Sequence, residues 1–150
     1  DARQLAFPDG AFDLSFHKGF WSCFADDGEI AKLFREQLRV TRGIALALVH
    51  NARNTRMRDL FRRKAASDNL YKVRFYQPEE LIEIARRGLA DAAVEATVAV
   101  RGFGGPDWMH GRLCARLGPR LRGRLAAVAY RWTPLGRAES LVLEVVRKTS

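Results

Sequence analysis

The sequence predicts an α/β fold built on a mixed sheet, and three patterns carry this prediction. The run over 44–49, IALALV, is continuously apolar and lies between Gly43 and the polar pair His50-Asn51, as expected of a parallel strand buried on both faces. A second short run, over 12–16, precedes it, and apolar residues at helical spacing lie between the two runs. Strand, crossover helix and strand together make a parallel unit.

Three helices are expected before residue 90. Asp26 or Asp27 caps the first, which ends near Gly43. A basic helix over about 55–66 follows, and Pro78 with two acids behind it begins a third helix that stops at Gly88. The apolar positions that support the first two are Ile30, Leu33, Phe34 and Leu38, then Met57, Leu60 and Phe61.

Two further strands complete the predicted sheet. Val94, Ala96, Val98 and Val100 alternate with Glu95 and Thr97, which indicates a half-exposed strand over 94–101. A final strand is expected over 141–146. Leucines at helical spacing, interrupted by Gly118-Pro119, predict two short helices over 108–132.

Length and composition place limits on the protein. With 150 residues and 47% hydrophobic content, residues 1–150 are expected to form a single domain with a real core. No apolar run is long enough to span a membrane, and nothing resembles a signal peptide. Cys23 and Cys114 lack metal-ligand spacing, so we expect no metal site, two reduced and buried thiols, and a cytoplasmic protein.

The formal net charge of +9 leaves two interpretations open. Basic residues gather over 53–64 and 101–124, which is consistent either with solvated helix faces or with a face that binds polyanions. The basic residues are not interleaved with aromatic residues along the sequence, unlike in a base-stacking platform.

Residues 1–17, DARQLAFPDGAFDLSFH, resemble the class I, Rossmann-like, S-adenosylmethionine-dependent methyltransferases, in which the segment reads D-A-x-x-L-P-F-x-D-G-x-F-D-x-V. The stretch YQPEELIEIARRGL over 76–89 is also similar to that family. The segment over 39–43, RVTRG, departs from it by lacking a proline and one glycine. The resemblance implies a partial Rossmann-like methyltransferase fold whose last strand is antiparallel to its neighbours.

The resemblance also implies site residues and a cofactor, S-adenosyl-L-methionine. Asp1 would accept from the adenine amine and the Ala2 N–H would donate to a ring nitrogen. Carboxyl ends of parallel strands form the ligand edge of such folds, and His17 and His50 are the candidate bases there. The remaining candidates are Phe16, His17 and Lys18 for the cofactor, and Trp21, Asn51 and Arg53 for the substrate.

Each of these residues also has an alternative, non-functional interpretation. Asp1 is an ordinary solvated side chain in one alternative, Trp21 only anchors its loop to the core in another, and both histidines face water at strand ends in a third.

The family's glycine-rich loop is missing from this sequence. Gly102 and Gly104 match it only superficially, because such a loop opens directly into a helix, whereas here Pro106 continues a loop. We therefore expect a carboxyl-terminal part of a methyltransferase domain that lacks its N-terminal βαβ half. The expected function is methyl transfer to a small-molecule or glycan-like acceptor. The alternatives are a non-catalytic binding module with a basic face and a nucleic-acid methyltransferase, which the absence of an N/D-P-P-Y/F motif after residue 16 disfavours.

Overall fold

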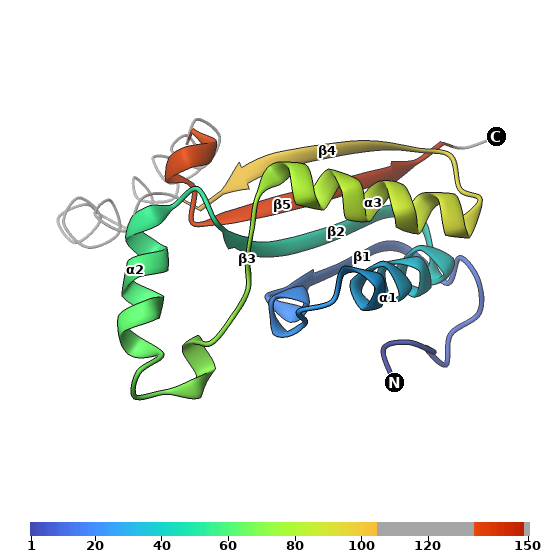
Figure 1. The fold of residues 1–150 in the computed structure, drawn as a ribbon. Helices are drawn as coiled ribbons and strands as arrows, with labels where there is room; N and C mark the ends of the chain where they lie inside the picture. The colour runs from blue at the N-terminus through green and yellow to red at the C-terminus, as the bar shows by residue number, and fades with distance from the viewer. Residues whose placement is uncertain (105–133, 149–150) are drawn as a thin grey trace, which may run out of the picture.

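A computed structural model describes residues 1–104 and 134–148 of the chain. Within these residues a five-stranded sheet has the order β1-β2-β5-β4, and β3 pairs with β2 beyond the end of β1 (Figure 1). The strands are β1 (Phe12–Lys18), β2 (Thr41–Asn51), β3 (Phe75–Tyr76), β4 (Ala96–Phe103) and β5 (Ser140–Arg147).

The strand directions confirm the predicted single sheet. β1 and β2 are parallel, while β5 is antiparallel to both β2 and β4. Val98 and Val100 pack against the core, as the alternation in β4 predicts. The short strand β3 was not predicted, because two residues are too few to show a period.

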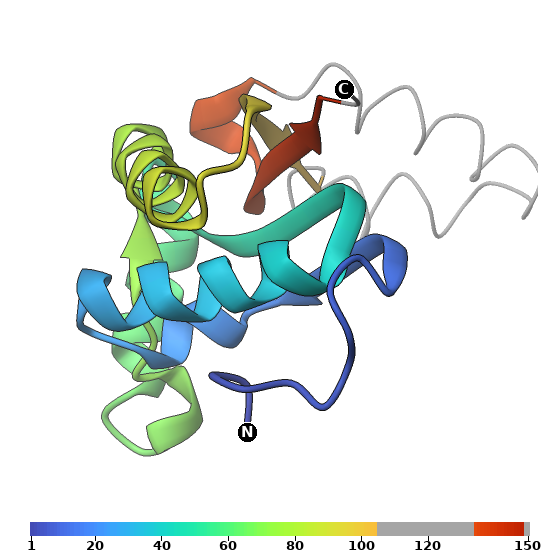
Figure 2. The same ribbon diagram turned by 90° about the vertical axis from the view of Figure 1, so that its right-hand side faces the viewer.

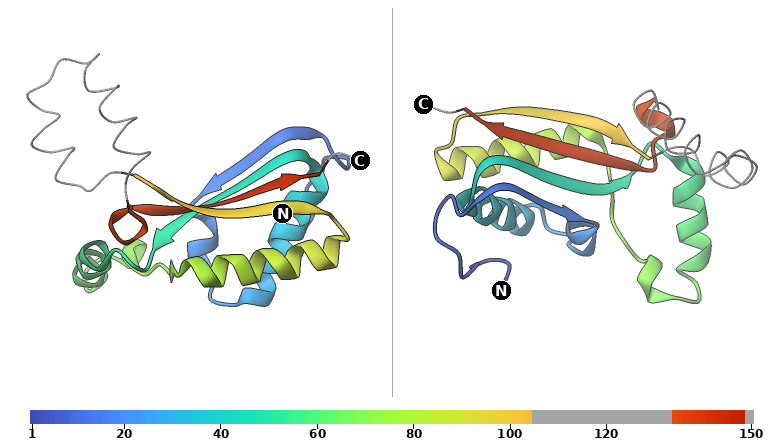
Figure 3. Two further views of the ribbon diagram at one scale, coloured as in Figure 1. Left: turned by 90° about the horizontal axis from the view of Figure 1, so that it is seen from above. Right: turned by 180° about the vertical axis from the view of Figure 1, so that it is seen from behind.

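Two helices cover one face of the sheet. α1 (Asp27–Val40) and α3 (Pro78–Ala92) lie side by side on that face (Figures 2 and 3). Between them and the sheet lies the core, which includes Trp21, Phe34 and Leu143. The Asp26 carboxylate caps α1 by accepting from the backbone N–H of Gly28 and Glu29, as expected.

The helix α2 (Thr55–Lys64) lies beyond the carboxyl end of β2, away from the core (Figure 1). It has no buried residue, so its predicted inward stripe of Met57, Leu60 and Phe61 is only half-buried. Short 3₁₀ turns occupy Phe20–Cys23, Asn69–Tyr71 and Leu135–Arg137.

Two glycines that were expected to end helices have another role. α1 already ends at Val40, and Gly43 lies inside β2. A Cβ there would collide with the carbonyl oxygen of Asp13 in β1. Gly88 lies inside α3, where a Cβ would lie 2.6 Å from the Phe34 ring. Both glycines permit close approach of two elements, and both predicted helix ends were wrong.

The opposite face of the sheet carries exposed apolar side chains. Leu14 is 51% exposed, Phe16 70% and Ile44 36%, and among the described elements none covers this face (Figure 3). β1 is also an edge strand of the described sheet, paired with β2 alone.

Some expectations are corrected or lie outside the described residues. Cys23 is exposed and not buried. Cys114 and the helices expected over 108–132 lie outside the described ranges. No helix in those ranges is long and apolar enough to cross a membrane.

We predict that Gly43→Ala destabilises the protein by about 1–3 kcal/mol, because the added methyl group forces β1 away from β2. Urea unfolding measures the change. Gly136→Ala is the control, since a Cβ at Gly136 meets nothing within 4 Å. Equal stability of the two variants would contradict the close β1–β2 contact.

Candidate active site

A cavity of about 210 Å³ lies between the N-terminal segment, β1 and α1. Its walls are mostly apolar and include Leu5, Phe7 and Leu33. Four residues predicted as site residues contribute to its lining: Ala2, Phe16, His17 and Trp21. A mostly apolar hollow with a few polar groups is the usual form of a small-molecule site.

His17, near the carboxyl end of β1, is the titratable group in this cavity. Its ring centroid lies 5.0 Å from that of Trp21 and 5.8 Å from that of Phe20. Both ring nitrogens are buried and have no hydrogen-bond partner within the described residues. Burial lowers the pKa of His17 to about 4, so the imidazole is neutral at pH 7, with one N–H donor and one acceptor nitrogen.

Gln37 adds a second polar group to the cavity, one that sequence reasoning missed. Its amide nitrogen donates to Ser15 Oγ at 3.0 Å and to the Leu46 carbonyl at 3.3 Å. Its side-chain oxygen is buried without a partner in the described part of the chain. A glutamine between Phe34 and Leu38 interrupts the apolar stripe of α1, and that interruption was the signal available in the sequence.

His50 lies at the same edge of the sheet as His17 but on the other face. His17 is paired with Ala47, whose side chain is on the core face. His50 is three residues after Ala47 in β2, and side chains alternate between the two faces of a strand, so His50 is on the other face. The His50 ring contacts Phe61 and Phe75, with centroids 5.0 and 5.3 Å away. Burial first, and the charge of Lys18 second, lower the pKa of His50.

The other predicted site residues are placed outside the cavity. Asp1 is exposed and accepts from the backbone N–H of Arg3 at 2.9 Å. Lys18 is exposed on the His50 face. Asn51 is buried, its amide donates to the carbonyls of Leu135 and Ala138, and Arg53 pairs with Glu79. The functional roles of these residues stay predictions.

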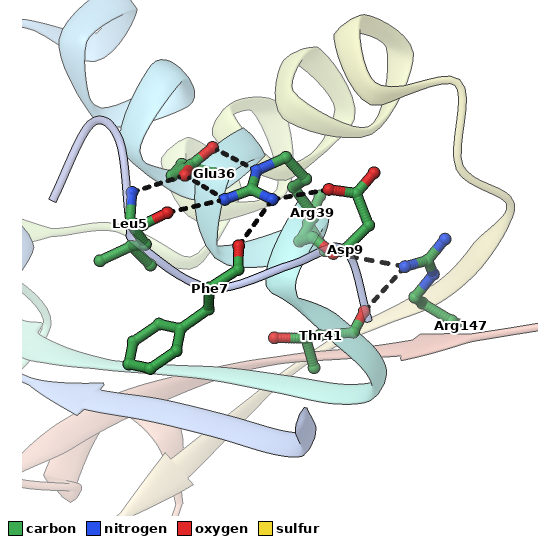
Figure 4. Close-up of polar contacts among 8 residues, drawn as sticks. Leu5, Phe7, Asp9, Glu36, Arg39, Thr41 and Arg147 are labelled. Carbon is green, nitrogen blue, oxygen red and sulfur yellow. Dashed lines mark hydrogen bonds and ion pairs between the residues drawn. The ribbon is translucent and has the colours of Figure 1, made fainter. Parts of the chain in front are cut away.

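The N-terminal wall of the cavity is held by Arg39 of α1 (Figure 4). The guanidinium donates to both oxygens of Glu36 and to Asp9 at 2.6 Å, and it also donates to two backbone carbonyls, those of Leu5 and Phe7 at 3.0 Å each. These contacts occupy all five N–H donors of an arginine side chain.

Glu36 completes this clamp by accepting from the backbone N–H of Leu5 at 2.7 Å. Hydrogen bonding from Arg39 lowers the pKa of Glu36 below its usual value, so the carboxylate stays charged and keeps accepting. Among the described residues no group of three or more His, Cys, Asp or Glu side chains could hold a metal ion.

Solved structures with this arrangement of strands and helices include methyltransferases. A SAM-dependent methyltransferase from Archaeoglobus fulgidus superposes with a TM-score of 0.56 at 12% identity, over 99% of this chain and 65% of that one. A possible histamine N-methyltransferase from Thermotoga maritima superposes with a TM-score of 0.56 at 19% identity, over 98% and 61%. The chain therefore has the fold of these methyltransferases and spans less than two thirds of their length.

The same fold also occurs in a protein described by another reaction. The 4+2 cyclase SpnF superposes with a TM-score of 0.53 at 19% identity, over 100% of this chain and 54% of that one. No protein-family model and no curated protein sequence matches the chain. The likeness therefore establishes the fold, and the reaction must be argued from the site.

We predict that His17 makes stability depend on pH. The folded-state pKa of His17 is about 4, against about 6.5 in an unfolded chain. Between these values the unfolded state binds the proton and the folded state does not, so stability is full above pH 6.5 and falls as the pH drops toward 4.

From pH 7 to pH 5, urea unfolding should show that the parent loses about 1–2 kcal/mol more than His17→Phe. Contributions from the carboxylates are common to both proteins and cancel. Parallel pH profiles for the two would mean that His17 is not buried in the folded protein.

We also predict that Arg39→Ala releases residues 5–9 from α1, because these residues lose three of the hydrogen bonds described above. The Leu5 amide should then exchange its hydrogen at least about tenfold faster, measured by hydrogen–deuterium exchange. Arg35→Ala is the matched control, one helical turn earlier, and should leave that rate unchanged. Equal protection in both variants would show that Arg39 does not hold the segment.

Proposed function

We propose that the chain is part of an S-adenosyl-L-methionine-dependent methyltransferase that acts on a small-molecule or glycan-like acceptor. The observation that carries the proposal is the apolar cavity beside β1, with the unpaired His17 nitrogens and Gln37 oxygen. The fold, which is that of several methyltransferases, is the second support. The ligand edge of such folds lies at the carboxyl ends of the parallel strands.

The residues of the cavity fit part of the cofactor. An adenine ring needs apolar walls and both a donor and an acceptor at its edge, and neutral His17 and Gln37 offer these groups. The proposed contacts of Asp1 and Ala2 with the adenine would come from the start of the N-terminal segment, where Ala2 lines the cavity. At about 210 Å³ the cavity is smaller than the 300–1,000 Å³ typical of sites that enclose a whole ligand of this size.

The rest of the cofactor site would come from strands that extend the sheet beyond β1. The free edge of β1 and the exposed Leu14 and Phe16 support this view, since exposed apolar edge strands promote aggregation unless they are covered. The methyltransferases compared above are longer than this chain, which leaves room for such strands.

The two histidines would then have separate tasks. S-adenosylmethionine supplies a methyl group activated by its sulfonium charge. His17 would contact the cofactor, while His50, on the other face beside Lys18, would lie toward the acceptor. A neutral His50 could accept the proton that an acceptor hydroxyl or amine loses. Positioning of the two reactants can supply much of the acceleration in such an in-line displacement.

Calorimetry with S-adenosylhomocysteine on the full natural protein tests the proposal. His17→Leu should weaken binding about tenfold or more, because it removes a buried hydrogen-bonding group. His17 makes no hydrogen bond within the described residues, so the substitution breaks none there, and the urea midpoint checks that losing the ring contacts with Trp21 and Phe20 leaves the fold intact.

His50→Leu is the matched control, and its affinity for S-adenosylhomocysteine should stay within about twofold of the parent, a difference well under 1 kcal/mol. Absence of binding by the parent protein, or equal losses in both variants, would refute the proposed cofactor site. Binding without any methyl transfer to candidate acceptors would favour the non-catalytic alternative.

A further inference from the structure

A second and larger cavity lies at the end of the sheet where β1 and β2 begin. It measures about 760 Å³ and is bounded by the segment at Asp9 and Gly10, by α1, by the start of β2 and by the end of β5. Five cationic side chains line it against the two carboxylates Asp9 and Glu36. The cations are Arg35, Arg39, Arg42, Arg147 and Lys148.

The two carboxylates of the lining are already engaged. Both are bound to Arg39, whose donors are fully used. Arg42 is likewise engaged, because it forms a bidentate pair with Asp13. These three ion pairs build the walls of the cavity and leave the remaining cations to determine what it binds.

Arg147 has hydrogen-bonding capacity to spare. One of its terminal nitrogens, Nη1, donates to the carbonyls of Thr41 at 2.7 Å and Leu38 at 3.3 Å. Its other terminal nitrogen points away from these carbonyls (Figure 4), and no carboxylate within the described residues pairs with it. Because Arg147 caps α1 in this way, the end of the helix does not present those carbonyls to an anion.

Arg35 and Lys148 complete the set. Arg35 is exposed and has no hydrogen-bond or ion-pair partner in the described part of the chain. Lys148 lies 3.6 Å from Glu95, and both side chains are mostly exposed. An exposed pair of this kind contributes little, so Lys148 can exchange Glu95 for a ligand.

We propose that this cavity binds a small ligand through a diphosphate or similarly charged phosphate group, held by Arg35, Arg147 and Lys148. Guanidinium groups match phosphate oxygens in geometry and charge. The volume of about 760 Å³ falls in the range of small-molecule pockets. A nucleic-acid backbone would instead require an extended basic stripe, so the concave shape favours a small ligand.

The proposal does not depend on the proposed methyl transfer, because none of its three cations lines the cavity beside β1, and His17 does not line this one. Failure of the cofactor experiment therefore leaves this proposal untouched, and the reverse also holds.

Calorimetry with pyrophosphate in a phosphate-free buffer tests the proposal. Arg35→Gln should weaken pyrophosphate binding about tenfold, and Lys148→Gln should weaken it in the same direction. Arg35 forms no ion pair within the described residues and acts on Glu36 only through its charge, so its loss should alter folding little, which the urea midpoint verifies. Arg63→Gln is the matched control: Arg63 is an exposed arginine of α2, at the other end of the sheet, and its affinity should stay within about twofold, under 1 kcal/mol.

Three results would overturn the proposal. The first is no pyrophosphate binding by the parent protein. The second is an equal loss in Arg35→Gln and Arg63→Gln, which would show that overall charge alone attracts the anion. The third is a single-stranded oligonucleotide that binds and depends on Arg35 while pyrophosphate does not, which would assign the surface to nucleic acid.

Discussion

The contact between Arg39 and the N-terminal segment is the interaction on which both cavities depend. The guanidinium fixes residues 5–9 along α1 through two carbonyls and the carboxylate of Asp9. Leu5 and Phe7 of that segment line the cavity beside β1, whereas Asp9 and Gly10 line the basic cavity. One fully used arginine therefore positions a segment that contributes residues to the lining of both cavities.

The parity of the strands decides which face of the sheet each histidine lies on. Residues of β2 with odd numbers, such as Ala47 and Val49, are buried against the helices, and His17 is paired into that set. His50 belongs to the even set and lies against Phe61 and Phe75. The sequence places both histidines at strand ends, but their difference in register parity puts their side chains on opposite faces of the sheet.

The local patterns of the sequence predict the fold well and the site less well. The run over 44–49 and the alternation after Val94 identify strands, because side-chain period follows directly from strand geometry. Gly43 and Gly88 mislead as helix ends, since their role is to let a distant backbone or ring approach. The Arg39–Asp9 pair joins residues 30 positions apart, and no local sequence pattern around either residue predicts it. Gln37 could have been identified, because a polar residue within an apolar stripe requires a partner.

The reversed direction of β5 explains why a basic cavity exists at the far end of the sheet. Parallel strands β1 and β2 both begin at that end and direct their carboxyl ends toward the candidate cofactor site. Since β5 is antiparallel to β2, its last residue, Arg147, reaches the start of β2 and donates to Thr41. In a wholly parallel sheet the last residue of β5 would lie at the opposite end of the sheet, with the carboxyl ends of β1 and β2. The antiparallel strand thus brings Arg147 and Lys148 to the C-terminal end of α1, at the end of the sheet opposite His17.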